Sequence, residues 1–81
     1  MEKRVGFTLE LDLHGMRVWE AQQELDRALD RAGKEIKEVI VIHGYRGGKA
    51  IRDMVRNEFR HPKVKQKMLS LNDGQTTFLL K

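Results

Sequence analysis

Two segments that each end in the pair His-Gly constrain the fold of this chain more than any other feature. Residues 7–13 alternate between apolar and polar side chains and lead into His14-Gly15, and four consecutive apolar residues, 39–42, lead into His43-Gly44. The spacing predicts a strand in each case, and a helical pattern follows both. Two strands joined by a helix run parallel, so we expect both His side chains at the carboxyl edge of one sheet, where open α/β sheets bind ligands.

The rest of the chain completes a small α/β pattern. Apolar residues at helical spacing predict helices over residues 18–32 and 49–60, the second ended by His61-Pro62. Residues 64–71 and 76–80 flank an Asn-Asp-Gly-Gln turn and predict a closing hairpin, with a bulge in its first strand and an antiparallel last strand. The predicted fold is a two-layer sandwich, β-α-β-α-β-β, with a four-stranded mixed sheet and two helices on one face.

The length and composition set further bounds. The 81 residues suffice for one small domain spanning residues 1–81, with residues 1–6 expected as a flexible N-terminus. The absence of cysteine excludes disulfides and thiolate metal sites and fits a reducing cytoplasm. No apolar run is long enough for a signal peptide or a membrane span, so we expect a cytoplasmic protein without a membrane partner. The oligomeric state is left open.

Charge is distributed unevenly along the chain. Residues 1–30 carry four basic and seven acidic side chains, whereas residues 31–67 carry eleven basic and four acidic ones. A basic half of this kind favours a polyanionic partner, most simply RNA or DNA. The alternative is an ordinary lysine-rich surface.

Three side chains at the predicted sheet edge could carry chemistry. Asp12, His14 and His43 combine two imidazoles, which titrate near neutral pH, with a carboxylate that can fix the tautomer of one of them. RNA cleavage needs such groups to remove the proton of a 2′-hydroxyl and to protonate the leaving oxygen. In the alternative, both histidines only bond backbone groups at the strand ends. A further interpretation is a site for a divalent metal ion, Mg²⁺ or Mn²⁺, at Glu10, Asp12 and His14, although the sequence offers few ligands for it.

A glycine-rich loop and a basic helix face complete the predicted site. Glycines let the backbone approach a ligand closely, and cations spaced along a helix can follow a phosphate backbone. Trp19 is either a platform for stacking a base or a side chain packed against a loop. The residues expected to bind phosphate or nucleic acid are Gly15, Arg17, Gly44, Tyr45, Arg46, Gly47, Gly48, Lys49, Arg52 and Arg56.

These motifs resemble the Smr (small MutS-related) domain. Leu11-Asp12-Leu13-His14-Gly15 is similar to the family's first motif, and Ile42-His43-Gly44 with the later glycines is similar to its second. Arg46 stands where the family usually has glycine, so the loop looks one residue longer. The resemblance implies a fold like the C-terminal domain of translation initiation factor three, in a free-standing protein or an excised domain.

The same resemblance implies a function. Smr domains include endonucleases that nick DNA or cleave RNA, some of them on ribosomes, and the family's functional positions fall on Asp12, His14 and His43. We therefore expect a nucleic-acid-binding endonuclease. The alternative is a non-catalytic adaptor that docks RNA or ribosomes.

Overall fold

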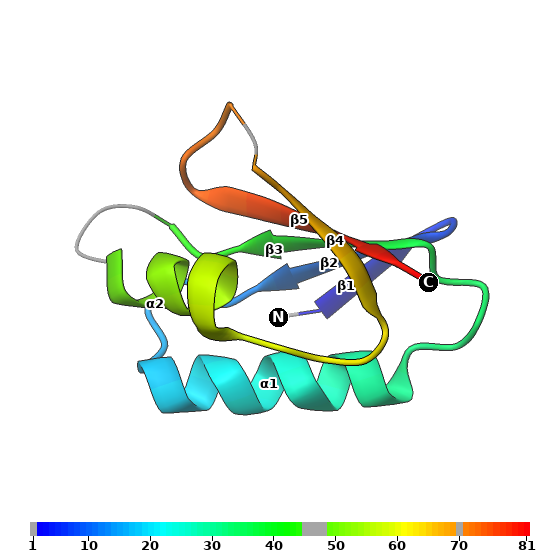
Figure 1. Ribbon diagram of the computed structural model, residues 1–81, viewed down its shortest axis with the longest axis horizontal. Helices are drawn as coiled ribbons and strands as arrows, with labels where there is room; N and C mark the ends of the chain where they lie inside the picture. Colours follow the sequence, from blue (N-terminus) through cyan, green and yellow to red (C-terminus); the bar gives the residue numbers. More distant parts are fainter. Residues whose placement is uncertain (1, 45–48, 70) are drawn as a thin grey trace.

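A mixed β-sheet forms one layer of the molecule and two helices form the other (Figure 1). The computed structural model describes residues 2–44, 49–69 and 71–81. Within these residues the sheet has five strands in the order β1-β2-β3-β5-β4. The strands are β1 (Glu2–Val5), β2 (Thr8–Asp12), β3 (Glu38–Ile42), β4 (Val64–Leu69) and β5 (Gln75–Leu80), and the helices are α1 (Val18–Arg31) and α2 (Lys49–Asp53), which continues into a π-helical turn, η1 (Met54–Glu58).

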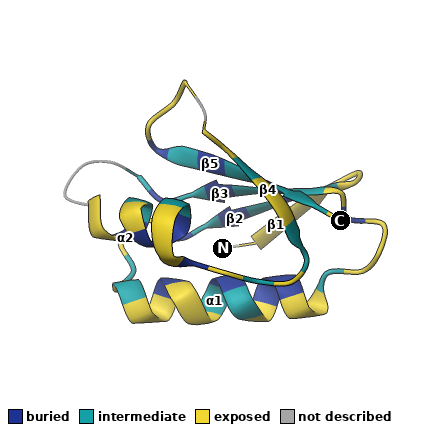
Figure 2. Cartoon of the chain, in the orientation of Figure 1, coloured by how far each residue is buried: buried dark blue, intermediate teal, exposed yellow. Residues whose placement is uncertain are grey.

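The predicted β-α-β unit lies at the centre of this fold. Strands β2 and β3 are parallel, with Asp12 in register with Ile42, and helix α1 connects them. Leu9 and Leu11 on β2, and Leu13 directly after it, face the helices and are buried, as the alternation of the sequence predicts. Figure 2 shows buried residues on the faces of the helices and strands that meet, and exposed residues on the outer face of α1. Both helices therefore cover the same face of the sheet, as expected.

The sheet has one strand more than predicted. Residues 2–5, expected as part of a flexible N-terminus, form β1, which pairs antiparallel with β2. Gly6, with φ +61°, makes the tight turn between the two strands. Strand β1 is exposed along its whole length, so it has no buried face and no apolar alternation in its sequence. Periodicity could not reveal this strand.

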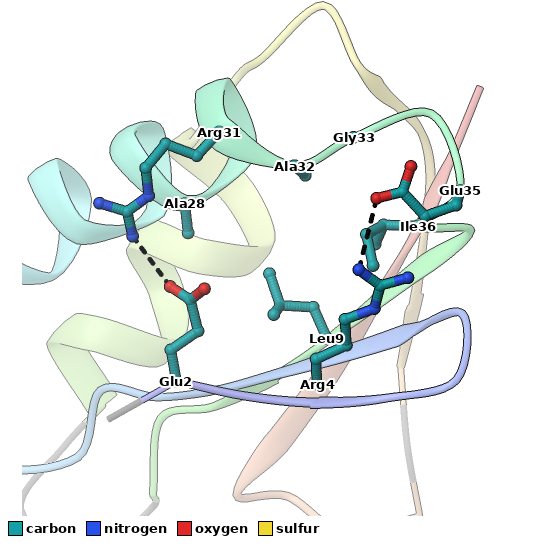
Figure 3. A pocket seen from close by; sticks show the side chains of 9 residues that line it. All are labelled: Glu2, Arg4, Leu9, Ala28, Arg31, Ala32, Gly33, Glu35 and Ile36. Atoms are coloured by element: carbon teal, nitrogen blue, oxygen red, sulfur yellow. Dashed lines mark hydrogen bonds and ion pairs between the residues drawn. The ribbon is translucent and has the colours of Figure 1, made fainter.

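Two ion pairs connect β1 to the C-terminal end of α1 and to the segment that follows it. Glu2 contacts Arg31 at 3.0 Å, and Arg4 contacts Glu35 at 3.4 Å. These pairs frame a pocket of about 140 Å³, seen from close by in Figure 3. The pocket lies at the C-terminal end of α1, at the opposite end of the helix from His14.

The second helix is less regular than its sequence predicts. After α2 the chain widens into η1, and the N–H of Phe59 donates to the carbonyl of Met54 at 2.7 Å. This five-residue turn brings Phe59 back over Met54, and both side chains are buried. Phe59 then stacks on Phe78 of β5, with 5.8 Å between the ring centroids. Packing against the sheet thus accompanies a departure from α-helical geometry.

The closing hairpin agrees with the prediction. Strand β5 pairs antiparallel with both β3 and β4, and a bulge lies between Val64 and Gln66. No helix among the described residues has the length and apolar character needed to cross a membrane.

Candidate nucleic-acid interface

The two His-Gly pairs meet at one edge of the sheet, as the sequence predicts. The N–H of Leu13 donates to the carbonyl of Ile42 at 2.7 Å, which continues the parallel pairing past the end of β2. Next to this bond, Gly44 lies so close to His14 that a Cβ built on the glycine would be 3.4 Å from the Cβ of the histidine. The φ of Gly44 is +75°. The positive φ would therefore strain any side chain at position 44, and its Cβ would be in van der Waals contact with His14.

Asp12 and His14 form a pair on the open face of β2. The Nδ1 of His14 lies 2.5 Å from Oδ1 of Asp12, and the backbone N–H of His14 donates to the same oxygen at 3.1 Å. Partial burial raises the pKa of Asp12, but the two hydrogen bonds and the charge of His14 lower it by more, so the pKa lies below its ordinary value. A carboxylate only accepts hydrogen bonds, so Nδ1 carries the proton and Nε2 of the neutral ring is the basic nitrogen. The His14 side chain is 70% exposed.

His43 points the other way, into the core. Its residue is 1% exposed. Nδ1 lies 2.9 Å from the carbonyl of Gly44, and Nε2 lies 2.9 Å from the hydroxyl of Thr76. That hydroxyl also accepts a hydrogen bond from Nε of Arg56 at 2.8 Å. The donor and the acceptor of each of these hydrogen bonds are determined: Arg56 donates to Thr76, Thr76 donates to Nε2 of His43, and Nδ1 of His43 donates to Gly44.

With the His43 ring neutral, every donor and acceptor in this series of hydrogen bonds has a partner. Burial lowers the pKa of His43, the Gly44 carbonyl raises it, and the charges of Arg56 and Arg52 lower it further, with a net pKa below the ordinary value. A buried ring with both nitrogens engaged does not present a nitrogen to a substrate. The expectation that both imidazoles emerge at the sheet edge is thus correct for His14 and wrong for His43.

Strand parity explains the difference between the two histidines. His14 has the parity of Asp12, on the open face of β2, whereas His43 has the parity of Val39 and Val41, on the buried face of β3. The two His-Gly pairs look equivalent in the sequence, but they are one residue out of step across the sheet. Since Ile40 and Ile42 are also apolar, the β3 sequence did not reveal which face is buried.

The hairpin between β4 and β5 supports the second His-Gly pair, a role that the sequence did not suggest. The carbonyl of Gly74 accepts hydrogen bonds from the N–H groups of both His43, at 2.9 Å, and Gly44, at 3.0 Å. Thr76, which follows in β5, is fully buried and holds the His43 ring. The sequence predicts only a turn and a strand here, and nothing in the spacing of these residues marks them as part of the site.

The predicted basic face separates into two parts. Lys49 is exposed, and the Arg52 side chain is 23% exposed, with its Nε 3.7 Å from Oδ1 of Asp53. Arg56 is 15% exposed and engaged: besides Thr76, its guanidinium donates to the carbonyl of Gln75 at 3.1 Å and lies 4.0 Å from Asp73. The face therefore offers fewer exposed cations than its helical spacing predicts.

Other predicted residues have simpler outcomes. Arg17 is exposed and precedes α1, with its backbone N–H donating to Glu20 at 3.0 Å. Glu10 lies beside Asp12 on the open face of β2, but the described residues include no group of three His, Asp or Glu side chains that could hold a metal ion. Predicted contacts that lie outside the described residues are Tyr45, Arg46, Gly47 and Gly48.

The fold and this edge define a small α/β domain in which two His-Gly pairs meet at the carboxyl end of parallel strands. A sequence model of the Smr domain matches residues 11–76, so the chain belongs to the Smr domain family. Its structure is similar to the crystal structure of the Smr domain of Thermus thermophilus MutS2, with 29% sequence identity and a TM-score of 0.78 over 89% of this chain and 96% of that chain. No curated protein sequence matches significantly. The predicted family and fold class are confirmed, apart from the additional strand.

Proposed function

We propose that this domain binds RNA and cleaves it, with His14 as the general base and Asp12 as the group that orients it. The observation that carries the proposal is the 2.5 Å contact between Asp12 Oδ1 and Nδ1 of an imidazole that is 70% exposed. A carboxylate on one ring nitrogen fixes the tautomer and stabilises the imidazolium that forms when the other nitrogen takes a proton. Membership of a nucleic-acid-associated family supports the same function.

The reaction follows from the position of the basic nitrogen. Nε2 of His14 removes the proton of a 2′-hydroxyl, and the oxygen attacks the adjacent phosphorus. The bond to the 5′-oxygen breaks, that oxygen takes a proton from water, and a 2′,3′-cyclic phosphate remains. Lys49 and Arg52 are the cations that would hold the phosphate, and general-base catalysis of this kind contributes about 100- to 10,000-fold.

In this proposal His43 is a positioning residue. Its hydrogen bond to Gly44 keeps the second His-Gly backbone beside His14. Loss of the His43 ring would therefore displace the surface that faces the substrate, although the ring itself touches no reacting atom.

The test is an assay with labelled RNA and supercoiled plasmid, each with and without chelator, followed by identification of the product ends. Cyclic 2′,3′-phosphate ends formed in chelator support the proposal. His14→Ala and Asp12→Asn should abolish or severely slow cleavage. Glu10→Gln is the matched control, because Glu10 lies two residues earlier on the same face of β2. Nicked plasmid with intact RNA would overturn the RNA mechanism, since DNA has no 2′-hydroxyl and needs an activated water.

One observation favours the alternative, a non-catalytic adaptor that docks RNA or ribosomes. Because His43 is buried, the edge offers one exposed imidazole where acid–base cleavage was expected to use two. Tight, salt-sensitive binding of RNA or ribosomes without cleavage in any of these assays would support the adaptor.

A further inference from the structure

A pocket at one edge of the sheet gathers positive charge away from the two His-Gly pairs. It has a volume of about 230 Å³, and it is lined by residues that follow η1 and by residues of the edge strand β4. The described residues that line it include no acidic side chain. Its cationic lining residues are Arg60, Lys65 and Lys67. A pocket lined by charge of one sign attracts ligands of the other sign, here an anion.

The pocket is separate from the candidate nucleic-acid interface. The start of β4 lies beside the end of β5, whereas the start of β5 lies beside the end of β3 and the second His-Gly pair. The first residues of β4 therefore place the pocket toward the opposite end of the sheet. Helix α2 and η1 connect the two regions, because Lys49 begins α2 and Arg60 follows η1. At about 1.5 Å per helical residue, these two cations lie roughly 15 Å apart along the helix.

Two cations of the pocket converge on one backbone oxygen. Nζ of Lys67 donates to the carbonyl of Phe59 at 2.6 Å, and Nη1 of Arg60 donates to the same carbonyl at 3.0 Å. Both positive charges are thus held close together at the pocket. Burial lowers the pKa of Lys67, and the charge of Arg60 lowers it further. A bound anion would relieve this repulsion between the two cations.

A β-bulge accompanies the third cation. The register between β4 and β5 shifts between Val64 and Gln66, so Lys65 is the residue at the bulge. Neighbouring residues of a regular strand point to opposite faces, and a bulge changes the direction of a side chain. At this bulge, Lys65, Gln66 and Lys67 all line the same pocket. The irregular backbone therefore gathers polar side chains around one cavity.

The described carboxylates leave the charge of this pocket uncompensated. None of them forms an ion pair with a cation of the pocket, whereas Arg56, one turn earlier, lies 4.0 Å from Asp73. Asp30 contacts the ring of His61 at 2.8 Å and does not line the pocket. The described part of the chain thus provides cations at this place without the anion that would balance them.

We propose that this pocket binds a backbone phosphate of RNA, as a second contact in addition to the one at His14. This inference rests on the proposed binding of RNA but not on cleavage. A phosphate has several acceptor oxygens, so it can take hydrogen bonds from a guanidinium and from ammonium groups at the same time. Because the pocket lies at the other end of α2 and η1 from Lys49, an RNA with several phosphates can follow the helix from one contact to the other.

Removal of charge at the rim tests the pocket in a folded protein. Arg60 and Lys65 are exposed, so the double variant Arg60→Gln and Lys65→Gln should keep the wild-type urea midpoint. The probe is a labelled single-stranded RNA with 2′-O-methyl groups, which cannot be cleaved through the 2′-oxygen. Anisotropy should show binding about tenfold weaker, as for the loss of one charge-assisted contact. The slope of log affinity against log salt should fall by about 0.7, the value for one phosphate of a single strand.

The matched control removes two cations elsewhere on the surface. Lys3, in β1 at the opposite edge of the sheet, and Lys34, after α1, are both exposed. The double variant Lys3→Gln and Lys34→Gln changes the net charge of the protein by the same amount as the pocket variant. It should bind the RNA with nearly the wild-type affinity and salt slope, because net charge alone does not make a specific contact.

The outcomes separate this inference from the proposed function. Wild-type affinity and slope in the pocket variant overturn the pocket and leave cleavage by His14 standing. Weaker binding by the pocket variant of a protein that cleaves no RNA supports the pocket and overturns the nuclease.

Other anions provide the remaining test, through the NMR chemical shifts of residues 60–67. Shifts that respond to polyglutamate as strongly as to RNA would assign the pocket to acidic protein segments. Shifts that respond to inorganic phosphate but not to RNA would assign it to a small anion. Either result overturns the proposal, whereas a response to RNA that polyglutamate does not reproduce supports it.

Discussion

Replacing His43 with alanine should destabilise the domain far more than replacing His14. The substitution removes a buried ring together with the hydrogen bond that it donates to the carbonyl of Gly44 and the one that it accepts from the hydroxyl of Thr76. Unsatisfied groups of this kind and the cavity left behind together cost about 2–5 kcal/mol. A domain of 81 residues has a free energy of unfolding of only about 4–12 kcal/mol. The variant should therefore lose a large part of its stability.

Urea denaturation at neutral pH measures this difference. His14→Ala is the control, because the His14–Asp12 pair is largely exposed and such pairs contribute about 0–1 kcal/mol. We expect a urea midpoint near the wild-type value for His14→Ala, with cleavage lost, and a clearly lower midpoint for His43→Ala. A His43→Ala protein with the wild-type midpoint and no cleavage would refute the reasoning, because the ring would then act in the chemistry and not in the fold.

The same placement predicts a dependence of stability on pH. The pKa of His43 is lowered in the folded protein from an ordinary value of 6.5, so the unfolded chain binds more protons between the two pKa values. The stability that comes from keeping this ring neutral is complete above pH 6.5 and declines as the pH falls from there toward the folded pKa. His43→Gln should weaken this decline in urea titrations at a series of pH values.

Three further predictions follow from the site and its supports. Asp12→Asn should make acid unfolding less steep, because the pKa of Asp12 is lowered on folding and the stability it provides is lost below its ordinary value of 3.8; an unchanged acid transition would contradict the Asp12–His14 pairing. The double variant Lys49→Gln and Arg52→Gln should flatten the salt dependence of RNA binding and keep the wild-type urea midpoint. Arg56→Gln should instead lower the urea midpoint, because it loses about 1–3 kcal/mol of the free energy of unfolding. Lys63→Met should destabilise α1 by about 1–2 kcal/mol, as seen in thermal denaturation, since Nζ of Lys63 donates to the carbonyls of Leu29 and Ala32 at the helix end, at 2.7 and 2.9 Å; an unchanged melting temperature would rule out this cap.

The elements with one buried face could be predicted from the sequence. Residues 9–13 show their buried face through strict alternation, and the helical spacing of residues 18–32 shows the stripe that covers them; the alternation also includes Phe7, which is exposed. The same alternation places Asp12 and His14 together on the open face, and the structure agrees. Local periodicity suffices to predict these elements because their apolar positions are the positions that become buried.

Elements without such a contrast could not be predicted in the same way. Strand β1 has no buried face, so its sequence carries no alternation, and β3 is apolar on both faces, so its sequence does not tell which side His43 takes. The widening of the second helix into η1 likewise accompanies the packing of Phe59 and Phe78, residues far apart in the chain.

The sequence by itself determined the family, the order of the central elements and the meeting of two His-Gly pairs at one sheet edge, because parallel strands must end on the same side. Only the tertiary structure decided the roles of the two histidines. His14 faces outward beside Asp12, whereas His43 is enclosed by Thr76 and Arg56, which come from distant parts of the chain. Those contacts depend on how the closing hairpin and α2 with η1 pack on the sheet, and no local pattern in the sequence records that packing.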